Sequence, residues 1–257
     1  MEIITYNIWD LPFWFVRDRK KRLLEIARYM VERGTEIICL QESWSLEYRK
    51  ALSDYMRAHG YHDAIHQAGI KRGNGGLLTF SKFPIASVRF IPFGRRAFAV
   101  SEIIGNKGAL ETNIETPRGL IKVINTHLHY SPSKMIETAS VRLRQLRTLF
   151  AAIKNEADMP TVLAGDFNEH DMVNEKQFEQ LFSKEGFLHH EQPEMTPTYR
   201  AENPLVNNWI NRIVASRQYD YILTRQIGKL GLRVSSYGPL YLNPVLSDHD
   251  PVSILLS

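Results

Sequence analysis

Short apolar runs recur along the whole chain, and many of them are rich in Ile, Val, Thr and Tyr. Runs of this length and β-branched content predict strands. Between some of the runs, apolar residues spaced three and four positions apart predict amphipathic helices. The predicted helices are 19–33, 46–58, 139–154 and 174–185. The predicted strands are 2–9, 36–42, 61–66, 76–81, 86–92, 97–104, 109–115, 120–128, 160–166, 219–224, 231–237 and 252–256.

The order of these elements predicts a mixed sheet rather than a purely parallel one. The turn at Pro117-Arg118-Gly119 separates two predicted strands and is typical of an antiparallel hairpin. Helical segments lie between other strands, which is typical of layered α/β proteins. We therefore expect two sheets packed face to face with helices outside. The irregular polar segment 189–218 is the predicted long loop, and loops of that length are often functional.

Length and composition predict one globular domain that spans residues 1–257. The 257 residues are 44% hydrophobic, which is enough for a substantial core. The formal net charge of +4 weakly favours anionic partners such as phosphodiesters or membrane surfaces. The single cysteine, Cys39, lies in an apolar run and excludes an intrachain disulfide. With no run near the ~20 apolar residues of a membrane span and no secretory signal, we expect a soluble protein, cytoplasmic or the mature form of an exported one.

Oxygen ligands and histidines lie at the ends of several predicted strands, where a rigid scaffold holds catalytic groups. Asn7, Glu42 and Asp248 supply the oxygen donors that a Mg²⁺ site uses. A zinc site would require more His or Cys. Each of these residues alone is more often an ordinary hydrogen-bonded side chain, and only the set favours a metal site.

Two pairs of polar residues, each two positions apart, share one side of an extended segment. Asp166 and Asn168 form one pair, and a carboxylate and an amide on one side can align a water and a phosphoryl oxygen. His127 and His129 form the other pair. A turn that caps the following helix is the structural alternative for the first pair, and hydrogen-bonded structural histidines are the alternative for the second.

His249 directly follows Asp248 and is a candidate general base. A carboxylate such as Asp220 could orient it, because a carboxylate on one ring nitrogen fixes the tautomer and raises the basicity of the other nitrogen. Spacing along the chain does not establish that pairing.

These residues occur in motifs whose order resembles that of the endonuclease/exonuclease/phosphatase superfamily of metal-dependent phosphoesterases. The resemblance spans residues 6–252. Within that superfamily, the opening motif is similar to that of the neutral, Mg²⁺-dependent sphingomyelinases. The motifs are "NIWDLPFW", "LQESW", "FSKFPI", "NTHLHYSP", "GDFNEHD", "YDYIL" and "SDHDPV".

The resemblance implies a four-layer α/β-sandwich of the DNase I type, in which two central mixed or antiparallel sheets are flanked by helices. It also implies hydrolysis of a phosphodiester by metal-assisted in-line attack of water, in a cleft at one end of the sheets. The implied metal ligands are Glu42, as the principal one, with Asn7 and Asp248 nearby. The implied ion is Mg²⁺, with Mn²⁺ and Ca²⁺ as alternatives.

The resemblance also assigns roles to the catalytic candidates His127, Asp166, Asn168, Asp220 and His249. Either His249, paired with Asp220, or Asp166 would activate or orient the water. Asn168 and His127 would bind the phosphoryl group, and His127 could also protonate the leaving oxygen. His129 would support this group from the same strand.

The apolar segment 11–16 directly follows the strand that ends near Asn7, and basic residues occupy much of 17–22. An apolar tip beside cationic residues is typical of a soluble enzyme that contacts a membrane surface. We therefore expect a phospholipid substrate, of sphingomyelin or lysophospholipid type. The substrate-binding candidates are Trp9, Phe13, Trp14, Lys107 and His129.

Other functions stay open at this point. The segment 11–16 would also suit a buried connection, and the basic residues with nearby tryptophans would suit a nucleic-acid strand. A DNA or RNA nuclease is therefore the second hypothesis, and a phosphatase with a soluble substrate is the third. A binding module without chemistry is disfavoured because every expected polar position is filled. We expect a monomer.

Overall fold

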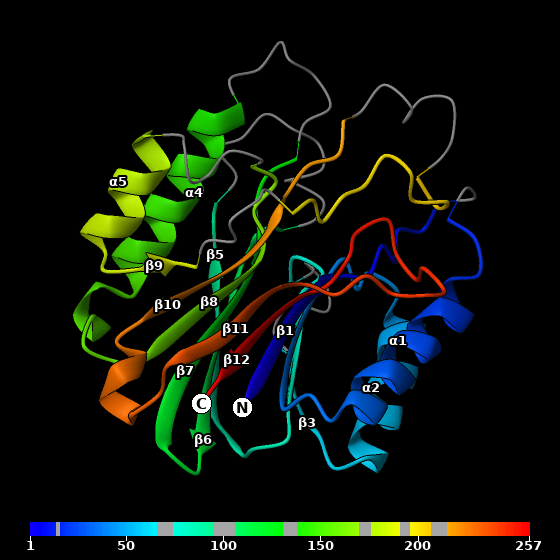
Figure 1. Ribbon diagram of the computed structural model, residues 1–257, viewed down its shortest axis with the longest axis horizontal. Helices are drawn as coiled ribbons and strands as arrows, with labels where there is room; N and C mark the ends of the chain where they lie inside the picture. The colour runs from blue at the N-terminus through cyan, green and yellow to red at the C-terminus, as the bar shows by residue number, and fades with distance from the viewer. Residues whose placement is uncertain are drawn as a thin grey trace.

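Two six-stranded sheets pack face to face, and helices cover the outer face of each sheet (Figure 1). The first sheet has the strand order β11-β12-β1-β2-β4-β3, and the second has the order β5-β6-β7-β8-β10-β9. The predicted four-layer α/β-sandwich is thereby confirmed. The computed structural model describes residues 1–13, 16–65, 74–94, 106–130, 138–169, 176–190, 196–206 and 215–257.

Both sheets are mixed. In the first, β1 runs parallel to β2, and in the second β7 runs parallel to β8, while the other neighbours are antiparallel. The strands of the first sheet are β1 (Glu2–Asn7), β2 (Ile37–Gln41), β3 (His62–Ala64), β4 (Leu78–Ser81), β11 (Val234–Pro239) and β12 (Val252–Leu256). Those of the second are β5 (Ile85–Pro92), β6 (Gly108–Thr116), β7 (Gly119–His127), β8 (Thr161–Asp166), β9 (Leu188–His189) and β10 (Asp220–Arg225).

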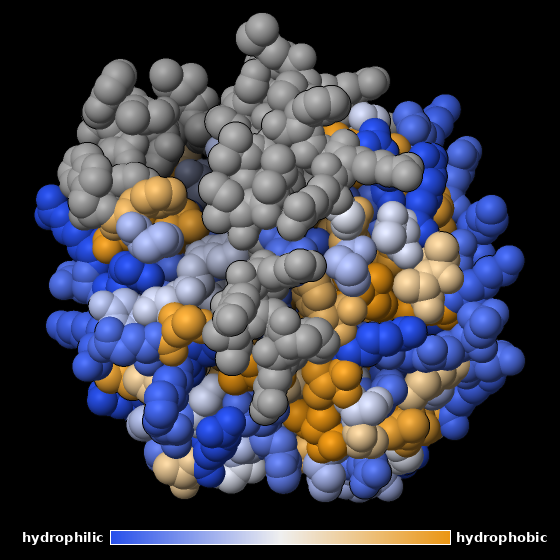
Figure 2. Space-filling view, turned by 180° about the vertical axis from the view of Figure 1, so that it is seen from behind, coloured by the Kyte–Doolittle hydropathy of each residue, from blue (hydrophilic) through white to orange (hydrophobic). Residues whose placement is uncertain are grey.

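Each parallel pair is joined by a crossover helix, as parallel pairing requires. The helices α1 (Arg19–Arg33) and α2 (Leu46–Ala58) lie outside the first sheet, whereas α4 (Thr138–Ala152) and α5 (Lys176–Lys184) lie outside the second (Figure 1). Short 3-10 helices η2 (Lys154–Glu156) and η4 (Ile227–Leu230) complete the described elements. Viewed from behind, hydrophilic residues dominate the flanks of the molecule, as expected for the outer faces of covering helices (Figure 2).

The core lies in three apolar layers. Ile3 and Ile37 from the first sheet meet Val162 and Ile222 from the second, and all four are fully buried. Cys39 belongs to the same middle layer. Burial of each such aliphatic side chain contributes roughly 1.5–3 kcal/mol. This central layer fixes the two sheets relative to each other, and with them the strand ends that carry polar residues.

The strand register places the polar residues at the ends of neighbouring strands next to one another, at one end of each sheet. Asn7 pairs with Gln41 at the ends of β1 and β2, and His127 pairs with Asp166 at the ends of β7 and β8. Because β10 is antiparallel to β8, its first residue, Asp220, pairs with Asp166 as well. The sequence motifs are therefore neighbours in space.

Most predicted elements lie where the pattern placed them, and the helices predicted at 19–33 and 46–58 have those bounds. The short edge strand β9 was not predicted. The strand predicted at 97–104 lies outside the described residues. No helix in the described part of the chain has both the length and the apolar character needed to cross a membrane.

Candidate active site

A cavity of about 320 Å³ opens at the edge where these strand ends meet. Most of the residues singled out in the sequence motifs line it, and so do several aromatic and apolar residues that were not singled out. The predicted residues in the lining are Asn7, Trp9, Glu42, His127, Asp166, Asn168, Asp248 and His249. The structure therefore brings together motifs that span almost the whole chain.

The backbone turns sharply where strands reach the cavity. Trp9, Glu42 and Asn168 have positive φ angles of 50°, 58° and 50°, which cost energy for residues other than glycine. Gly165 is required for another reason, because a Cβ atom there would lie 2.0 Å from the Thr126 carbonyl oxygen on the neighbouring strand. Strained positions of this kind cluster at functional sites, and here they direct the side chains of strand-end residues into the cavity.

Asp166 lies at the centre of the polar network. Its Oδ2 accepts a hydrogen bond from Asn7 Nδ2 at 3.0 Å, and its Oδ1 accepts one from the Asn168 backbone N–H at 2.8 Å. Burial alone would raise the pKa of Asp166, but His127, His249 and the Asn7 hydrogen bond together hold it below its usual value. Asp166 is therefore an ionised carboxylate with donors on both oxygens.

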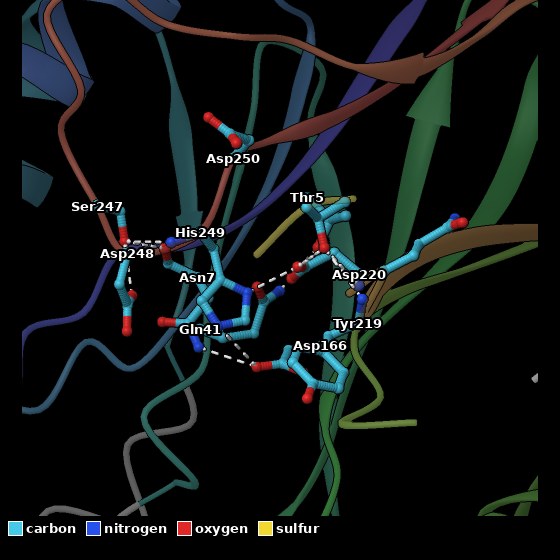
Figure 3. A network of polar contacts seen from close by, with 12 residues as sticks. Thr5, Asn7, Gln41, Asp166, Tyr219, Asp220, Ser247, Asp248, His249 and Asp250 are labelled. Carbon is cyan, nitrogen blue, oxygen red and sulfur yellow. Dashed lines mark hydrogen bonds and ion pairs between the residues drawn. The ribbon is translucent and has the colours of Figure 1, made fainter. Parts of the chain in front are cut away.

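Asp220 and His249 form the pair that the sequence could not establish. The His249 Nδ1 atom lies 2.7 Å from Asp220 Oδ2, and the Nε2 atom lies 3.9 Å from Asp166 Oδ2 (Figure 3). With Nδ1–H donating to Asp220, the Nε2 atom of a neutral His249 would be the acceptor on the cavity side.

The protonation of this pair is set by burial and by nearby carboxylates. Burial raises the pKa of Asp220 to about 6, although His249 opposes the rise. Burial by itself lowers the pKa of His249, but Asp220, Asp166 and Asp248 raise it well above its usual value. The site thus holds more negative charge than its own cationic groups balance.

Glu42 and Asp248 account for much of that excess charge. The Glu42 Oε2 atom is buried and has no hydrogen-bond partner among the described residues. Burial and the neighbouring Asp248 carboxylate raise the pKa of Glu42 to about 8, and burial also raises that of Asp248. Two partly buried carboxylates without a neutralising partner are unfavourable, and a hard divalent cation fits such oxygen donors.

A second group of potential ligands lies close by. One ligand atom each from Asp166, Asp220 and His249 lies within 4.8 Å of the others. Both oxygens of Asp166 already accept hydrogen bonds, and Asp220 Oδ2 accepts from both His249 and Thr198. Asp220 Oδ1 and Glu42 Oε2 each lack a hydrogen-bond partner among the described residues. Glu42 and Asp248 fit an ion better, because Asp166 and Asp220 already hold neighbouring residues through hydrogen bonds.

His127 contributes a neutral imidazole. Its Nε2 atom lies 3.5 Å from Asp166 Oδ2 and 4.0 Å from Glu42 Oε1. Burial and the charge of Lys107 lower the pKa of His127 to about 3. A neutral His127 can donate one hydrogen bond, but it carries no second proton for a leaving oxygen at neutral pH.

Some predicted substrate-binding residues do not line the cavity. β7 ends at His127, so strand alternation does not extend to His129, which is buried and donates its backbone N–H to Gln145 Oε1. His129 is therefore not among the described residues that line the cavity. Lys107 is buried and donates to the Leu128 carbonyl at 2.6 Å. Phe13 is half-exposed outside the lining, and Trp14 lies outside the described residues.

Several residues at the site were not identified from the sequence. Arg22, one of the basic residues in segment 17–22, is buried and donates to the backbone carbonyls of Ile8, Trp9 and Leu246. It thereby ties the segment after Asn7 to the segment before Asp248. No sequence signal separated Arg22 from its basic neighbours. The lining residues that were missed are Tyr130, Tyr199, Leu205, Val206 and Tyr219, whereas Leu11 belongs to the apolar segment 11–16.

Two curated proteins are similar in sequence to part of this chain. The chain is 30% identical over 142 residues to the "Putative neutral sphingomyelinase" of Caenorhabditis elegans, which covers 50% of this chain and 31% of that protein. It is 24% identical over 166 residues to "Protein angel homolog 2" of Danio rerio, which covers 60% of this chain and 28% of that protein. The matched segments thus span less than a third of the length of either relative.

Solved structures share the fold over nearly the full chain. Sphingomyelinase C from Streptomyces griseocarneus has a TM-score of 0.77 at 19% identity, covering 99% of this chain and 98% of that one. A beta toxin variant from Staphylococcus aureus with bound magnesium ions has a TM-score of 0.73 at 17% identity, with 98% of both chains covered. D. rerio TDP2 complexed with single strand DNA product has a TM-score of 0.73 at 15% identity, covering 100% and 98%.

A family model matches almost the whole chain, from residue 4 to residue 249. The matched range includes each strand end that contributes to the cavity, from Asn7 to His249. The protein therefore belongs to the Endonuclease/Exonuclease/phosphatase family.

Proposed function

We propose that this protein is a divalent-metal-dependent phosphodiesterase that hydrolyses the head-group ester of a phospholipid of sphingomyelin or lysophospholipid type. One observation carries the proposal: a single cavity is lined by Glu42, whose Oε2 atom has no hydrogen-bond partner among the described residues, by His249, which is paired with Asp220, and by an aromatic and apolar wall. The family membership supports the hydrolytic part. The sphingomyelinase relative and the similar sphingomyelinase structure support the choice of lipid.

The metal ligands in this proposal are Glu42, Asp248 and the side-chain oxygen of Asn7. The Asn7 Oδ1 atom accepts one hydrogen bond, from the Trp9 backbone at 3.1 Å, and its second lone pair is available. The preferred ion is Mg²⁺, with Mn²⁺ or Ca²⁺ as alternatives, and the magnesium-bound beta toxin variant of similar fold supports this choice. When bound, the ion would stabilise negative charge that develops on the phosphoryl oxygens.

His249 is the general base in this proposal. Its Nδ1 atom is held by Asp220, so in the neutral form of His249 the Nε2 atom is the one that can take a proton from water. The nearby carboxylates raise the pKa of His249, and a divalent cation held by Glu42 and Asp248 would offset part of that effect. Asp166 is less suited to that role because both of its oxygens already accept hydrogen bonds. We assign to Asp166 the task of holding Asn7 and orienting the water.

His127 and Asn168 bind the phosphoryl group in this scheme. His127 is neutral and lies within 4.0 Å of both Asp166 and Glu42, so its ring N–H can be donated to a phosphoryl oxygen. One amide hydrogen of Asn168 is directed to the Leu128 carbonyl at 3.2 Å, which fixes the amide plane. The second amide hydrogen remains for the substrate.

The composition of the cavity wall favours lipid over nucleic acid. Among the described residues that line the cavity there is no Lys or Arg, whereas Leu11, Leu205 and Val206 contribute apolar surface. A nucleic-acid groove requires cationic side chains that follow the phosphate backbone. The similar structure with single strand DNA product keeps a nuclease as the second candidate.

A substrate panel tests the proposed function. The purified protein is incubated, with Mg²⁺ and with EDTA, with sphingomyelin vesicles, a lysophospholipid, abasic-site DNA or single-stranded RNA. We expect phosphorylated head group to be released from one of the lipids only in the presence of Mg²⁺. Cleavage of a nucleic acid without release from either lipid would replace the lipid proposal with the nuclease one.

Phe13→Ser should reduce hydrolysis of vesicle-borne lipid by roughly tenfold and leave hydrolysis of a short soluble phosphodiester nearly unchanged. Phe13 is 50% exposed and follows Leu11, which lines the cavity. Withdrawal of the exposed half of its ring from water would contribute about 1–1.5 kcal/mol to interfacial binding, and a factor of ten corresponds to about 1.4 kcal/mol.

The matched control is Leu120→Ser. Leu120 is 44% exposed near the start of β7, at the strand end opposite His127. This variant should act on vesicles as the wild type does. Equal losses for Phe13→Ser on vesicles and on the soluble ester would show that Phe13 supports the site rather than the membrane contact.

A further inference from the structure

One buried residue, Thr198, hydrogen bonds to both of the segments that supply the Asp220–His249 pair. Its backbone N–H donates to the Arg217 carbonyl at 2.9 Å, in the segment that leads into β10. Its carbonyl accepts the Asp250 N–H at 2.6 Å, directly after His249. Thr198 is thus connected through its backbone to both segments that supply the pair.

The hydrogen-bond partners of the Thr198 hydroxyl determine where its proton points. The Oγ1 atom accepts the backbone N–H of Tyr219 at 3.0 Å and that of Asp220 at 3.2 Å. A hydroxyl has two acceptor lone pairs and one proton. Because the two backbone donors occupy the acceptor positions, the proton is directed to Asp220 Oδ2, which lies 2.6 Å away.

The oxygen that receives this proton is also the one that holds the histidine. Asp220 Oδ2 lies 2.7 Å from His249 Nδ1 (Figure 3). Rotation about the Cβ–Cγ bond of an aspartate is soft, so one hydrogen bond alone would leave the carboxylate poorly oriented. The second bond, from Thr198, keeps Oδ2 directed at the imidazole, and therefore Nε2 directed at the cavity.

We propose that Thr198 is a positioning residue that acts through the Asp220 carboxylate to hold His249 in the orientation needed for hydrolysis. The inference rests on the proposed function, in which His249 is the general base. Thr198 is fully buried and is not among the described residues that line the cavity, so it does not touch substrate directly. Its effect is on the chemical step and not on substrate binding.

Two substitutions separate the hydroxyl from the shape of the side chain. Thr198→Val keeps the shape and removes the hydroxyl, whereas Thr198→Ser keeps the hydroxyl. We expect Thr198→Val to lower kcat by roughly 10- to 100-fold, as for the loss of a partner that orients a metal-bound histidine, with KM within about twofold. Thr198→Ser should retain kcat within about threefold.

Thr224→Val is the matched control for buried-threonine effects. Thr224 is also fully buried, on β10, and its Oγ1 atom lies 2.9 Å from His190 Nε2, away from the cavity lining. This variant also removes a buried hydrogen bond of a threonine hydroxyl, so it should lower the melting temperature without lowering kcat. If Thr198→Val loses more kcat than Thr224→Val does, the excess loss is due to the altered Asp220–His249 pair.

A double-mutant cycle identifies the route of the effect. If Thr198 acts only through Asp220, Thr198→Val should cause no further loss in an Asp220→Ala background. A further tenfold loss there, or equal impairment of Thr198→Ser and Thr198→Val, would overturn the proposal.

A measurement without turnover distinguishes this proposal from the proposed function. The His249 Nδ1 proton resonance should shift in Thr198→Val and stay in place in Thr198→Ser, whichever phosphodiester the protein cleaves. If phospholipids are not hydrolysed but the resonance and the cycle behave as expected, the substrate assignment fails and the role of Thr198 stands. An unchanged His249 resonance in Thr198→Val would exclude the positioning role of Thr198 and would leave the proposed substrate untouched.

Discussion

Glu42→Gln is expected to lower phosphodiester hydrolysis by roughly a thousandfold, with the protein still folded. In our proposal Glu42 is the principal metal ligand, and its Oε2 atom is buried without a hydrogen-bond partner among the described residues. The amide keeps the shape of the side chain but removes the negative charge that a hard cation requires. A thousandfold loss corresponds to about 4 kcal/mol of transition-state stabilisation.

Thermal unfolding gives a second readout that does not depend on turnover. A ligand that binds only the folded state raises its stability, so Mg²⁺ should raise the melting temperature of the wild type and have little effect on Glu42→Gln. In metal-free buffer the variant should be at least as stable as the wild type, because burial and Asp248 disfavour the charged form of Glu42, whose pKa is raised to about 8, and glutamine carries no charge.

Glu115→Gln is the matched control for this substitution. Glu115 is exposed on β6, near the hairpin at the end of the sheet opposite the cavity. Its replacement should change neither the rate nor the effect of Mg²⁺ on melting. Full activity in Glu42→Gln, together with a normal Mg²⁺-induced rise in melting temperature, would remove Glu42 from the metal site.

The hydrophobic pattern predicted the fold well because strands and helices here are long enough to show their period. α1 and α2 each contain at least three turns and have the predicted bounds. β9 has two residues, Leu188 and His189, which is too few for alternation to be visible. Its place in the sheet comes from pairing with β10, a contact that no local pattern encodes.

The polar residues at strand ends were predictable for a similar reason. An apolar run that is followed directly by a carboxylate or amide residue is visible in a short stretch of sequence. His129 shows the limit of that reasoning. Alternation places residues two apart on one face only while the strand continues, and β7 ends at His127. The chain beyond that point is set by contacts to α4, such as the hydrogen bond from the His129 N–H to Gln145.

Residues that support the site from a distance were not predictable. Arg22 belongs to a cationic run that resembles a solvated first helical turn, and only the tertiary fold places the Leu246 carbonyl 2.6 Å from its guanidinium. Thr198 lies in an irregular polar segment with no periodicity, and its partner Asp220 is 22 residues away. Such contacts become visible only when distant segments are placed side by side.

His249→Ala and Asp220→Ala are each expected to lower kcat by roughly 10²- to 10⁴-fold, the usual contribution of a general base. The double variant should be no worse than the more impaired single variant. Asp220 is fully buried and reaches the cavity only through His249, at 2.7 Å, so it has nothing left to orient once the imidazole is absent. Groups that act as a unit show such non-additive losses.

The melting temperature of each single and double variant must also be measured. His249→Ala leaves the buried Asp220 carboxylate with Thr198 as its side-chain donor, which can lower stability. Asp220→Asn, which conserves shape, is the companion variant if Asp220→Ala unfolds.

The same substitutions should leave the Mg²⁺-induced rise in melting temperature intact, since the proposed ligands Glu42 and Asp248 are untouched. Losses that multiply in the double variant would mean that Asp220 and His249 contribute independently, and the base would then have to be sought at Asp166.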